Sequence, residues 1–480
     1  MMTPLRLLLL GLSFAATLSA ANPDKPNLIY ILADDLGWGD VGFNGNTFVK
    51  TPALDRIAAD GVRMERFYAQ AASCSPTRAS AMTGRNGHRF GIPRANNGHL
   101  KFEERSLGEF LQDHGYTTGH FGKWHLGTLT ETRLDANRGG KPHGVGHYAP
   151  PWDHGFDVSF VTESKVPTWD PMIRPIDAPK TYWAPKTPDA DPADWTAYGT
   201  YYWTGPDQVA TENLNGANSR VIMDRVIPFI DDAVENEQPF LAMVWFHTPH
   251  LPVVAGEEYT SLYSDLTPFE QHYYGSITAM DEQVGRLRER LEALGQWENT
   301  ILIFGSDNGP ETIDHSDDQP AAGSAGPFRG RKRFILEGGV RVPGIVSWPN
   351  GLGDLKESAL PFVTTDVLPS MVNLLEGQGT DAGVMPIDGT DALSLLRSGK
   401  THRPKVIPYE FVKQLSLIDN EWKLYSDDLG ETYRLYNVVE DPTETRDFAL
   451  EYPQRVRAMR LHLEAWREST RRSAAGADYR

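Results

Sequence analysis

Continuous apolar runs alternate along the chain with segments of helical periodicity. Residues 26–32, 239–246 and 300–304 lack the alternation of a half-exposed strand, so we expect strands buried on both faces of a parallel sheet. A further strand is expected at 116–121. Apolar positions three to four residues apart predict amphipathic helices, which cover 51–62, 106–114, 219–235 and 274–294. This alternation is typical of an α/β fold with a large, mostly parallel central sheet flanked by helices.

Two regions depart from this rhythm. Residues 128–215 are rich in Pro, Gly, Trp, Tyr and His without clear periodicity, and we expect a long loop insertion there, where specificity often resides. From about residue 375 the character changes, with strands expected at 422–425 and 432–436 and a closing helix at 453–469. The sequence therefore predicts a large domain over 22–375 and a smaller C-terminal α+β subdomain over 376–480.

The first 21 residues have the layout of a secretory signal peptide. Arg6 gives a positive start, residues 7–18 are apolar, and Ser19-Ala20-Ala21 supplies the small residues of a cleavage site. The apolar run is too short to span a bilayer, which takes about 20 residues. No later stretch reaches that length. We therefore expect an exported protein, periplasmic or secreted, without a membrane span.

Composition and net charge make some classes of partner and of covalent link improbable for this chain. The chain of 480 residues is 40% hydrophobic and 23% charged, which is ordinary globular usage. Its 46 basic and 64 acidic residues give a net charge of −18, which disfavours nucleic acid because phosphates would be repelled. A single cysteine excludes an intrachain disulfide, so the lone thiol of an exported protein needs another explanation.

Acidic and amide side chains follow two of the expected buried strands. Asp34 and Asp35 come after the first, and Asp307 and Asn308 after the strand at 300–304. Ligands of open α/β sheets bind beyond the carboxyl ends of strands. If these strands are neighbours, the oxygens converge and hold a cation, for which Ca²⁺ or Mg²⁺ is favoured over zinc. The alternative is two unrelated turns, since Asp and Asn favour turns.

The lone cysteine lies in an unusual setting. Residues 74–78 read Cys-Ser-Pro-Thr-Arg, and Thr-Gly-Arg follows at 83–85. An isolated cysteine is ordinarily a small buried hydrophobe. Taken by itself, the spacing of Cys74, Pro76 and Arg78 is a hypothesis of function.

This segment resembles the signature of the type I sulfatases, a family of the alkaline phosphatase-like superfamily, except that Thr77 stands where serine is commoner. Further resemblances follow in family order at 27–39, 122–127 (Gly-Lys-Trp-His-Leu-Gly), 248–252 (Thr-Pro-His-Leu-Pro), 306–309 (Ser-Asp-Asn-Gly), 329–332 with 337–343, and 441–444 (Asp-Pro-Thr-Glu). The resemblance covers about residues 26–450, nearly the whole mature chain. It implies an alkaline phosphatase-like sandwich and a sulfuric ester hydrolase, with the catalytic domain over 22–375.

The resemblance also implies roles for individual residues. Cys74 is oxidised to formylglycine (3-oxoalanine) by a maturase, and its hydrate attacks sulfur. Ca²⁺, with Mg²⁺ as the weaker alternative, is held by Asp34, Asp35, Asp307, Asn308 and the modified Cys74. Arg78 holds the nucleophile, and His125 assists the release of sulfate from it. Lys123 and Lys332 bind sulfate oxygens, and His250 binds substrate and protonates the leaving alcohol.

Residues outside the matched motifs are open to two interpretations. His315 and Arg329 follow the second metal motif and are candidates for substrate binding; a solvated loop is the alternative. His247 is a weaker candidate. The aromatic residues of the insertion either stack on sugar rings or pack the long loop; they are Trp169, Trp183, Tyr201, Tyr202 and Trp203.

The resulting expectation is an exported, calcium-dependent sulfatase acting on a sulfated carbohydrate, such as carrageenan, another sulfated polysaccharide or a glycosaminoglycan. The carbohydrate rests on analogy with exported bacterial enzymes. The alternatives are an arylsulfatase, a phosphodiester or phosphonate hydrolase of the same superfamily, and a non-catalytic sulfoglycan-binding protein. Its expected partners are the glycan and the maturase.

Overall fold

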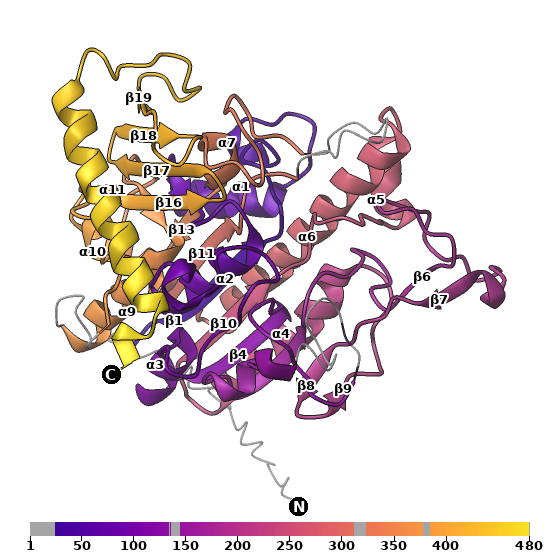
Figure 1. Cartoon of the computed structure of the whole chain (residues 1–480). Helices are drawn as coiled ribbons and strands as arrows, with labels where there is room; N and C mark the ends of the chain where they lie inside the picture. The colour runs from indigo at the N-terminus through magenta and orange to yellow at the C-terminus, as the bar shows by residue number, and fades with distance from the viewer. Residues whose placement is uncertain (1–24, 134, 136–144, 312–322, 378–384, 480) are drawn as a thin grey trace, which may run out of the picture.

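A twisted ten-stranded sheet forms the centre of the molecule (Figure 1). The computed structural model describes residues 25–133, 135, 145–311, 323–377 and 385–479, so the expected signal peptide lies outside the described residues. The strands follow the order β14 (Glu357–Ser358), β2 (Val62–Met64), β13 (Ile345–Ser347), β11 (Thr300–Ser306), β1 (Asn27–Ala33), β10 (Phe240–Trp245), β4 (Thr117–Lys123), β5 (Val158–Thr162), β8 (Trp203–Gly205) and β9 (Gln208–Val209). The consecutive strands from β11 to β5 are all parallel.

Both faces of this sheet are covered, which explains the continuous apolar runs. In β1, Ile29 and Ile31 join one core cluster, whereas Leu28, Tyr30 and Leu32 join the other. The first cluster packs against α1 (Pro52–Asp60), α4 (Asn218–Glu235) and α6 (Pro268–Ala293). The second packs against α2 (Cys74–Thr83), α3 (Leu107–Asp113), α9 (Val367–Glu376) and α10 (Ala392–Arg397). The predicted α/β sandwich is therefore confirmed.

The segment expected to be a loop insertion is only partly one. β5 lies within it and extends the parallel sheet beside β4, and β8 and β9 continue the same sheet. Only the hairpin of β6 (Ile173–Pro175) and β7 (Trp195–Ala197) projects away from the body (Figure 1). β5 is short and follows a Pro-rich and Gly-rich stretch, so its strand pattern is hidden in the sequence.

A second, antiparallel sheet forms the C-terminal part. Its strands are β16 (Ile407–Phe411), β17 (Gln414–Asp419), β18 (Trp422–Ser426) and β19 (Arg434–Asn437), and α11 (Pro453–Ala474) runs along it (Figure 1). The remaining short elements are β3 (Phe67–Tyr68), β12 (Arg341–Val342), β15 (Phe362–Val363), α5 (Glu257–Thr260), α7 (Glu337–Val340) and α8 (Pro349–Leu352). The predicted small C-terminal α+β subdomain is confirmed in character, whereas α10 packs in the core of the large sheet.

Buried charges join the two parts. Lys423 of β18 lies 2.9 Å from Glu337 and 3.0 Å from Glu444, and all three side chains are inaccessible to solvent. The Glu444 carboxylate also accepts the backbone N–H of Glu337 at 2.8 Å. Glu444 belongs to the Asp-Pro-Thr-Glu turn, so this motif anchors the C-terminal subdomain. No helix in the described part of the chain is both long and apolar enough to cross a membrane.

Candidate active site

The carboxyl ends of the parallel strands bring most of the predicted residues to one edge of the sheet. Asp34 and Asp35 directly follow β1, and Asp307 and Asn308 directly follow the adjacent β11. Lys123 is the last residue of β4. The loop after β10 carries the histidine motif of residues 248–252, and the Asp34 backbone N–H donates to the Thr248 carbonyl at 2.9 Å. The two acidic clusters are therefore spatial neighbours.

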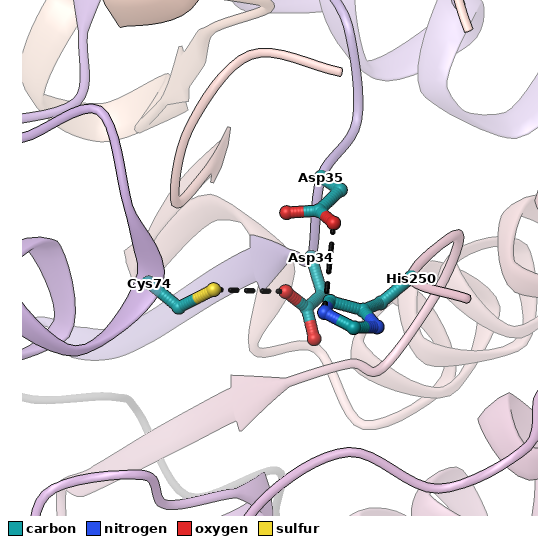
Figure 2. A group of neighbouring side chains, drawn as sticks. All are labelled: Asp34, Asp35, Cys74 and His250. Carbon is teal, nitrogen blue, oxygen red and sulfur yellow. Dashed lines mark hydrogen bonds and ion pairs between the residues drawn. The ribbon is translucent and has the colours of Figure 1, made fainter. Parts of the chain in front are cut away.

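Helix α2 places the cysteine motif against this edge. The helix begins at Cys74 and every one of its residues is buried. The Cys74 Sγ lies 3.7 Å from Asp34 Oδ1, and Figure 2 shows it pointing toward the carboxylates and His250. Arg78 lies one helical turn further, where residues four apart share a face, and its guanidinium reaches the same carboxylates. The spacing from Cys74 to Arg78 thus sets both groups on the inner face of α2.

Each carboxylate of the cluster has a cation 2.7 Å away. Arg78 donates to Asp307 through Nε at 3.0 Å and Nη2 at 2.7 Å. The ammonium of Lys123 lies 2.7 Å from Asp34, and that of Lys332 lies 2.7 Å from Asp35. Burial raises the pKa of Asp35 and Asp307, while the neighbouring cations oppose this rise. For Lys123 and Lys332, the adjacent carboxylates outweigh burial and raise the pKa, so both lysines carry a positive charge.

The donor set fits a hard divalent cation. Asn308 donates through Nδ2 to Asp35 and to the Gly309 carbonyl, whereas its buried Oδ1 has no hydrogen-bond partner among the described residues. Donor atoms of Asp34, Asp35, Cys74 and His250 lie within 4.8 Å of one another (Figure 2). A buried amide oxygen without a donor is costly unless something binds it, and carboxylate with amide oxygens suits Ca²⁺ or Mg²⁺.

The thiol of Cys74 is held in its neutral form. Burial, followed by the charge of Asp307, raises its pKa to about 12. The nucleophilic form of cysteine is the thiolate, and catalytic cysteines have a lowered pKa. Cys74 as a plain thiol is therefore a poor nucleophile, although it occupies the centre of the cluster.

The rings of His125 and His250 are each oriented by a hydrogen bond to a neighbouring group. His125 Nε2 lies 2.6 Å from Asn96 Oδ1. His250 Nδ1 donates to the Leu251 carbonyl at 2.6 Å, which leaves Nε2 facing Asp35 at 3.6 Å. Burial and then the charges of nearby lysines lower the pKa of His250 well below its usual range. His250 is accordingly neutral before an anion enters.

Comparison with known proteins decides the family. The Sulfatase family profile matches residues 26–377. The chain belongs to the sulfatase family. It is 30% identical over 415 residues to the N-acetylgalactosamine-6-sulfatase of Mus musculus, covering 82% of this chain and 70% of that protein. It is 32% identical over 435 residues to arylsulfatase G of Homo sapiens, covering 83% and 76%.

Solved structures share the fold. The crystal structure of Ps i-CgsB in complex with k-i-k-neocarrahexaose superimposes with a TM-score of 0.75 at 23% identity, over 95% of this chain and 97% of that one. The family match and the named sulfatase relatives make this chain a sulfuric ester hydrolase, as its motifs predict.

Thr77, where the sulfatase motif departs from the usual serine, serves the local backbone. Its hydroxyl donates to the carbonyls of Ala71 and Ser73 at 3.0 and 3.2 Å and accepts the Ala71 N–H at 3.1 Å. A serine hydroxyl has the same bonding capacity, which explains why threonine is accommodated.

The other candidates differ in their surroundings. Arg329 is exposed and donates to the Glu444 carbonyl in the C-terminal subdomain, and its role in substrate binding stays a prediction. His247 is buried, with its ring nitrogens bonded to Thr162 and Asn218, which is a structural role. Tyr202 and Trp203 are inaccessible to solvent and therefore pack the core. His315 lies outside the described residues.

Three further residues at the site of this sulfatase lie outside the sequence motifs. Asn96 bonds His125, and Glu311 lies 3.2 Å from Lys332, where the lysine lowers the pKa of Glu311 to about 2. Lys165 follows β5 and acts electrostatically on His250. Glu311 and Lys165 follow the sheet strands β11 and β5, whereas Asn96 lies in the loop between α2 and α3. The insertion expected at 128–215 concealed Lys165.

Proposed function

We propose that this sulfatase hydrolyses a sulfate ester of a sulfated carbohydrate, with formylglycine at position 74 and Ca²⁺ at the carboxylates. The observation that carries the proposal is the buried cluster of Asp34, Asp35 and Cys74 with its paired cations. The mouse relative is named for a sulfated sugar, which supports a carbohydrate substrate. A carrageenan, another sulfated polysaccharide and a glycosaminoglycan are the substrate classes to test.

A modified Cys74 and a bound cation would supply what the unmodified residues lack. The formylglycine hydrate would provide a nucleophilic hydroxyl and a second hydroxyl that allows sulfate to be released, and the cation would offset negative charge there. Asp34, Asp35, Asp307 and Asn308 would hold the cation. The high pKa of the Cys74 thiol supports modification, because an unmodified thiol is a poor nucleophile.

The chain's own cations prepare the site for an anion. Lys123 and Lys332 are buried point charges at the rim of the carboxylates, and a divalent cation would free them to bind sulfate oxygens. Arg78 stays on Asp307 and fixes the edge of the site. His250 would hold the proton for the departing alcohol, and an entering sulfate would favour that protonation by offsetting the lysine charges.

Export follows from the leader. Residues 1–21 have the signal-peptide pattern, and we infer a periplasmic or secreted mature enzyme beginning near Asn22. N-terminal sequencing of the exported protein tests this inference, and an intact Met1 on the exported chain would contradict it.

The mass of one tryptic peptide tests the proposed nucleophile. The peptide from Phe67 to Arg78 contains Cys74, and conversion of its thiol to an aldehyde lowers the mass by about 18 Da. The protein is produced together with a formylglycine-generating maturase, and Thr77→Ser serves as the matched control. A converted peptide with sulfate release from a glycan panel supports the proposal. Conversion with faster release of phosphate than of sulfate indicates the phosphodiester or phosphonate hydrolase instead.

A further inference from the structure

Lys165 lies at the same edge of the sheet as the sulfate-binding residues. β5 ends at Thr162, which pairs with Lys123, the last residue of β4. The chain then continues alongside the second motif, because the His125 N–H donates to the Glu163 carbonyl at 2.8 Å. Lys165 is two residues further. Its place after a parallel strand is the place from which the sheet presents its other site residues.

Lys165 differs from the other lysines of the site in having no counterion. Lys123 and Lys332 each lie 2.7 Å from a carboxylate. Within the described ranges of the chain, the half-buried Lys165 has neither a hydrogen bond nor an ion pair. A partly desolvated ammonium without a partner is costly, so a lysine is retained in such a place at the expense of stability.

Lys165 lies among charges of both signs. Burial lowers the pKa of Lys165 and the charges of Lys332 and Lys123 lower it further, whereas Asp35 and Asp34 oppose this fall. Lys165 in turn contributes to the low pKa of His250. These interactions agree with the place that strand pairing gives Lys165, at the edge of the sheet that carries the site.

The charge balance shows what Lys165 is suited to bind. Four cations match the four carboxylates of the site: Arg78, Lys123, Lys332 and Arg333 pair with Asp307, Asp34, Asp35 and Glu311. Lys165 is an addition to that balance. With Lys123 and Lys332 assigned to the sulfate ester, the additional cation is left for another group of the same substrate. That group must be anionic, and it would lie toward the β5 side of the site, because Lys165 follows β5.

We propose that Lys165 is a specificity residue that binds a second anionic group of the substrate, a further sulfate or a uronate carboxylate on the same or the adjoining sugar. This inference rests on the proposed carbohydrate sulfatase activity and deepens it. The preferred substrates then carry at least two negative groups, and neutral sugars with a single sulfate ester are poorer ones.

The test compares Lys165→Met with the wild-type enzyme on matched substrates. Methionine keeps roughly the length of the lysine side chain and removes its charge. The control is Lys400→Met, which removes the same charge at an exposed position after α10, far from the motifs. The substrates are a disulfated disaccharide, a singly sulfated disaccharide with a uronate, and a singly sulfated neutral disaccharide. We expect Lys165→Met to raise KM about tenfold on one of the dianionic substrates and less than about twofold on the neutral sugar. If KM rises on the disulfated disaccharide, the second group is a sulfate. If it rises on the disaccharide with a uronate, the group is a carboxylate.

Binding separates this proposal from the proposed activity. In a Cys74→Ala background, which cannot turn over, the dissociation constants of the same disaccharides are measured with and without Lys165→Met. If Lys165→Met weakens binding of a dianionic disaccharide selectively, the role of Lys165 is supported. This holds even if the wild-type enzyme releases no sulfate, because the absence of sulfate release would refute only the proposed hydrolysis. Equal losses on all three disaccharides, or no loss on any, would overturn the assignment of Lys165.

Discussion

Arg78 and Asp307 form a fully buried ion pair in which Nε and Nη2 of the guanidinium reach the same carboxylate oxygen, at 3.0 and 2.7 Å. The pair joins the cysteine helix α2 to the end of β11. Arg78 also donates to the Lys123 carbonyl at 3.1 Å, at the end of β4, and lies 5.1 Å above the Trp245 ring. One side chain of the signature motif therefore ties together three of the strands that carry the site.

Removing Arg78 should destabilise the protein as well as inactivate it. Arg78→Met leaves Asp307 buried without its counterion, and we expect the free energy of unfolding of the metal-free protein to fall by about 3 kcal/mol or more. Denaturant unfolding measures the change. Arg290→Met, which breaks the exposed pair with Asp231, is the control and should cost much less, because water screens exposed pairs. Equal costs for the two variants would contradict a structural role of the buried pair.

Asn308 should contribute directly to metal binding. Asn308→Leu removes the buried amide oxygen that lacks a donor, and we expect calcium affinity to fall at least about tenfold. Titration calorimetry on the chelator-treated protein measures it. Asn308→Asp retains an oxygen at this position and should keep most of the affinity. Unchanged affinity in the leucine variant would place the ion elsewhere.

His250 should matter most for poor leaving groups. A sugar alkoxide needs a proton as it departs, whereas an activated phenolate does not, so His250→Ala should lower kcat/KM on a sugar sulfate about a hundredfold. The loss on an activated aryl sulfate should be much smaller. The aryl substrate is therefore an internal control for folding and metal content. A loss of the same size on both substrates would argue against protonation of the leaving group by His250.

His154 should make the fold sensitive to acid. Its ring is buried and stacks on Phe102, and in the part of the chain that the structure describes neither ring nitrogen has a hydrogen bond. Burial lowers its pKa from 6.5 to about 4. The native state therefore binds this proton at a lower pH than the unfolded state does. Stability from His154 is complete above pH 6.5 and declines as the pH falls toward 4, by up to about 3 kcal/mol.

The variant His154→Phe tests that linkage. Unfolding free energies of the variant and the parent are compared between pH 7 and about 4; the phenylalanine variant should lose less stability across this window. His402→Phe, at an exposed histidine, should follow the parent curve. A parent and a His154→Phe variant with parallel pH profiles would show that this histidine does not titrate on unfolding.

The order of elements followed from the sequence because local signals were strong. β1, β10 and β11 are buried on both faces, so their residues are apolar throughout and mark the strands. The helices α4 and α6 bury one face and show it as a periodic apolar pattern. The acidic residues after β1 and β11 could be assigned to one site because parallel strands end at a common edge.

Tertiary structure decided what local patterns do not encode. β5 reads Val-Ser-Phe-Val-Thr, which suits a strand, but only the pairing with β4 shows that it extends the parallel sheet. Lys165, Asn96 and Glu311 reach the site from segments without a motif. Arg329 binds the Glu444 carbonyl across the junction with the C-terminal subdomain, a contact that no motif predicts. The sequence by itself determined the family and the fold class, because these depend on residue type and spacing along the chain. Which charges are paired, which oxygen lacks a donor and which lysine lacks a counterion depend on contacts between distant segments, and only packing settles those.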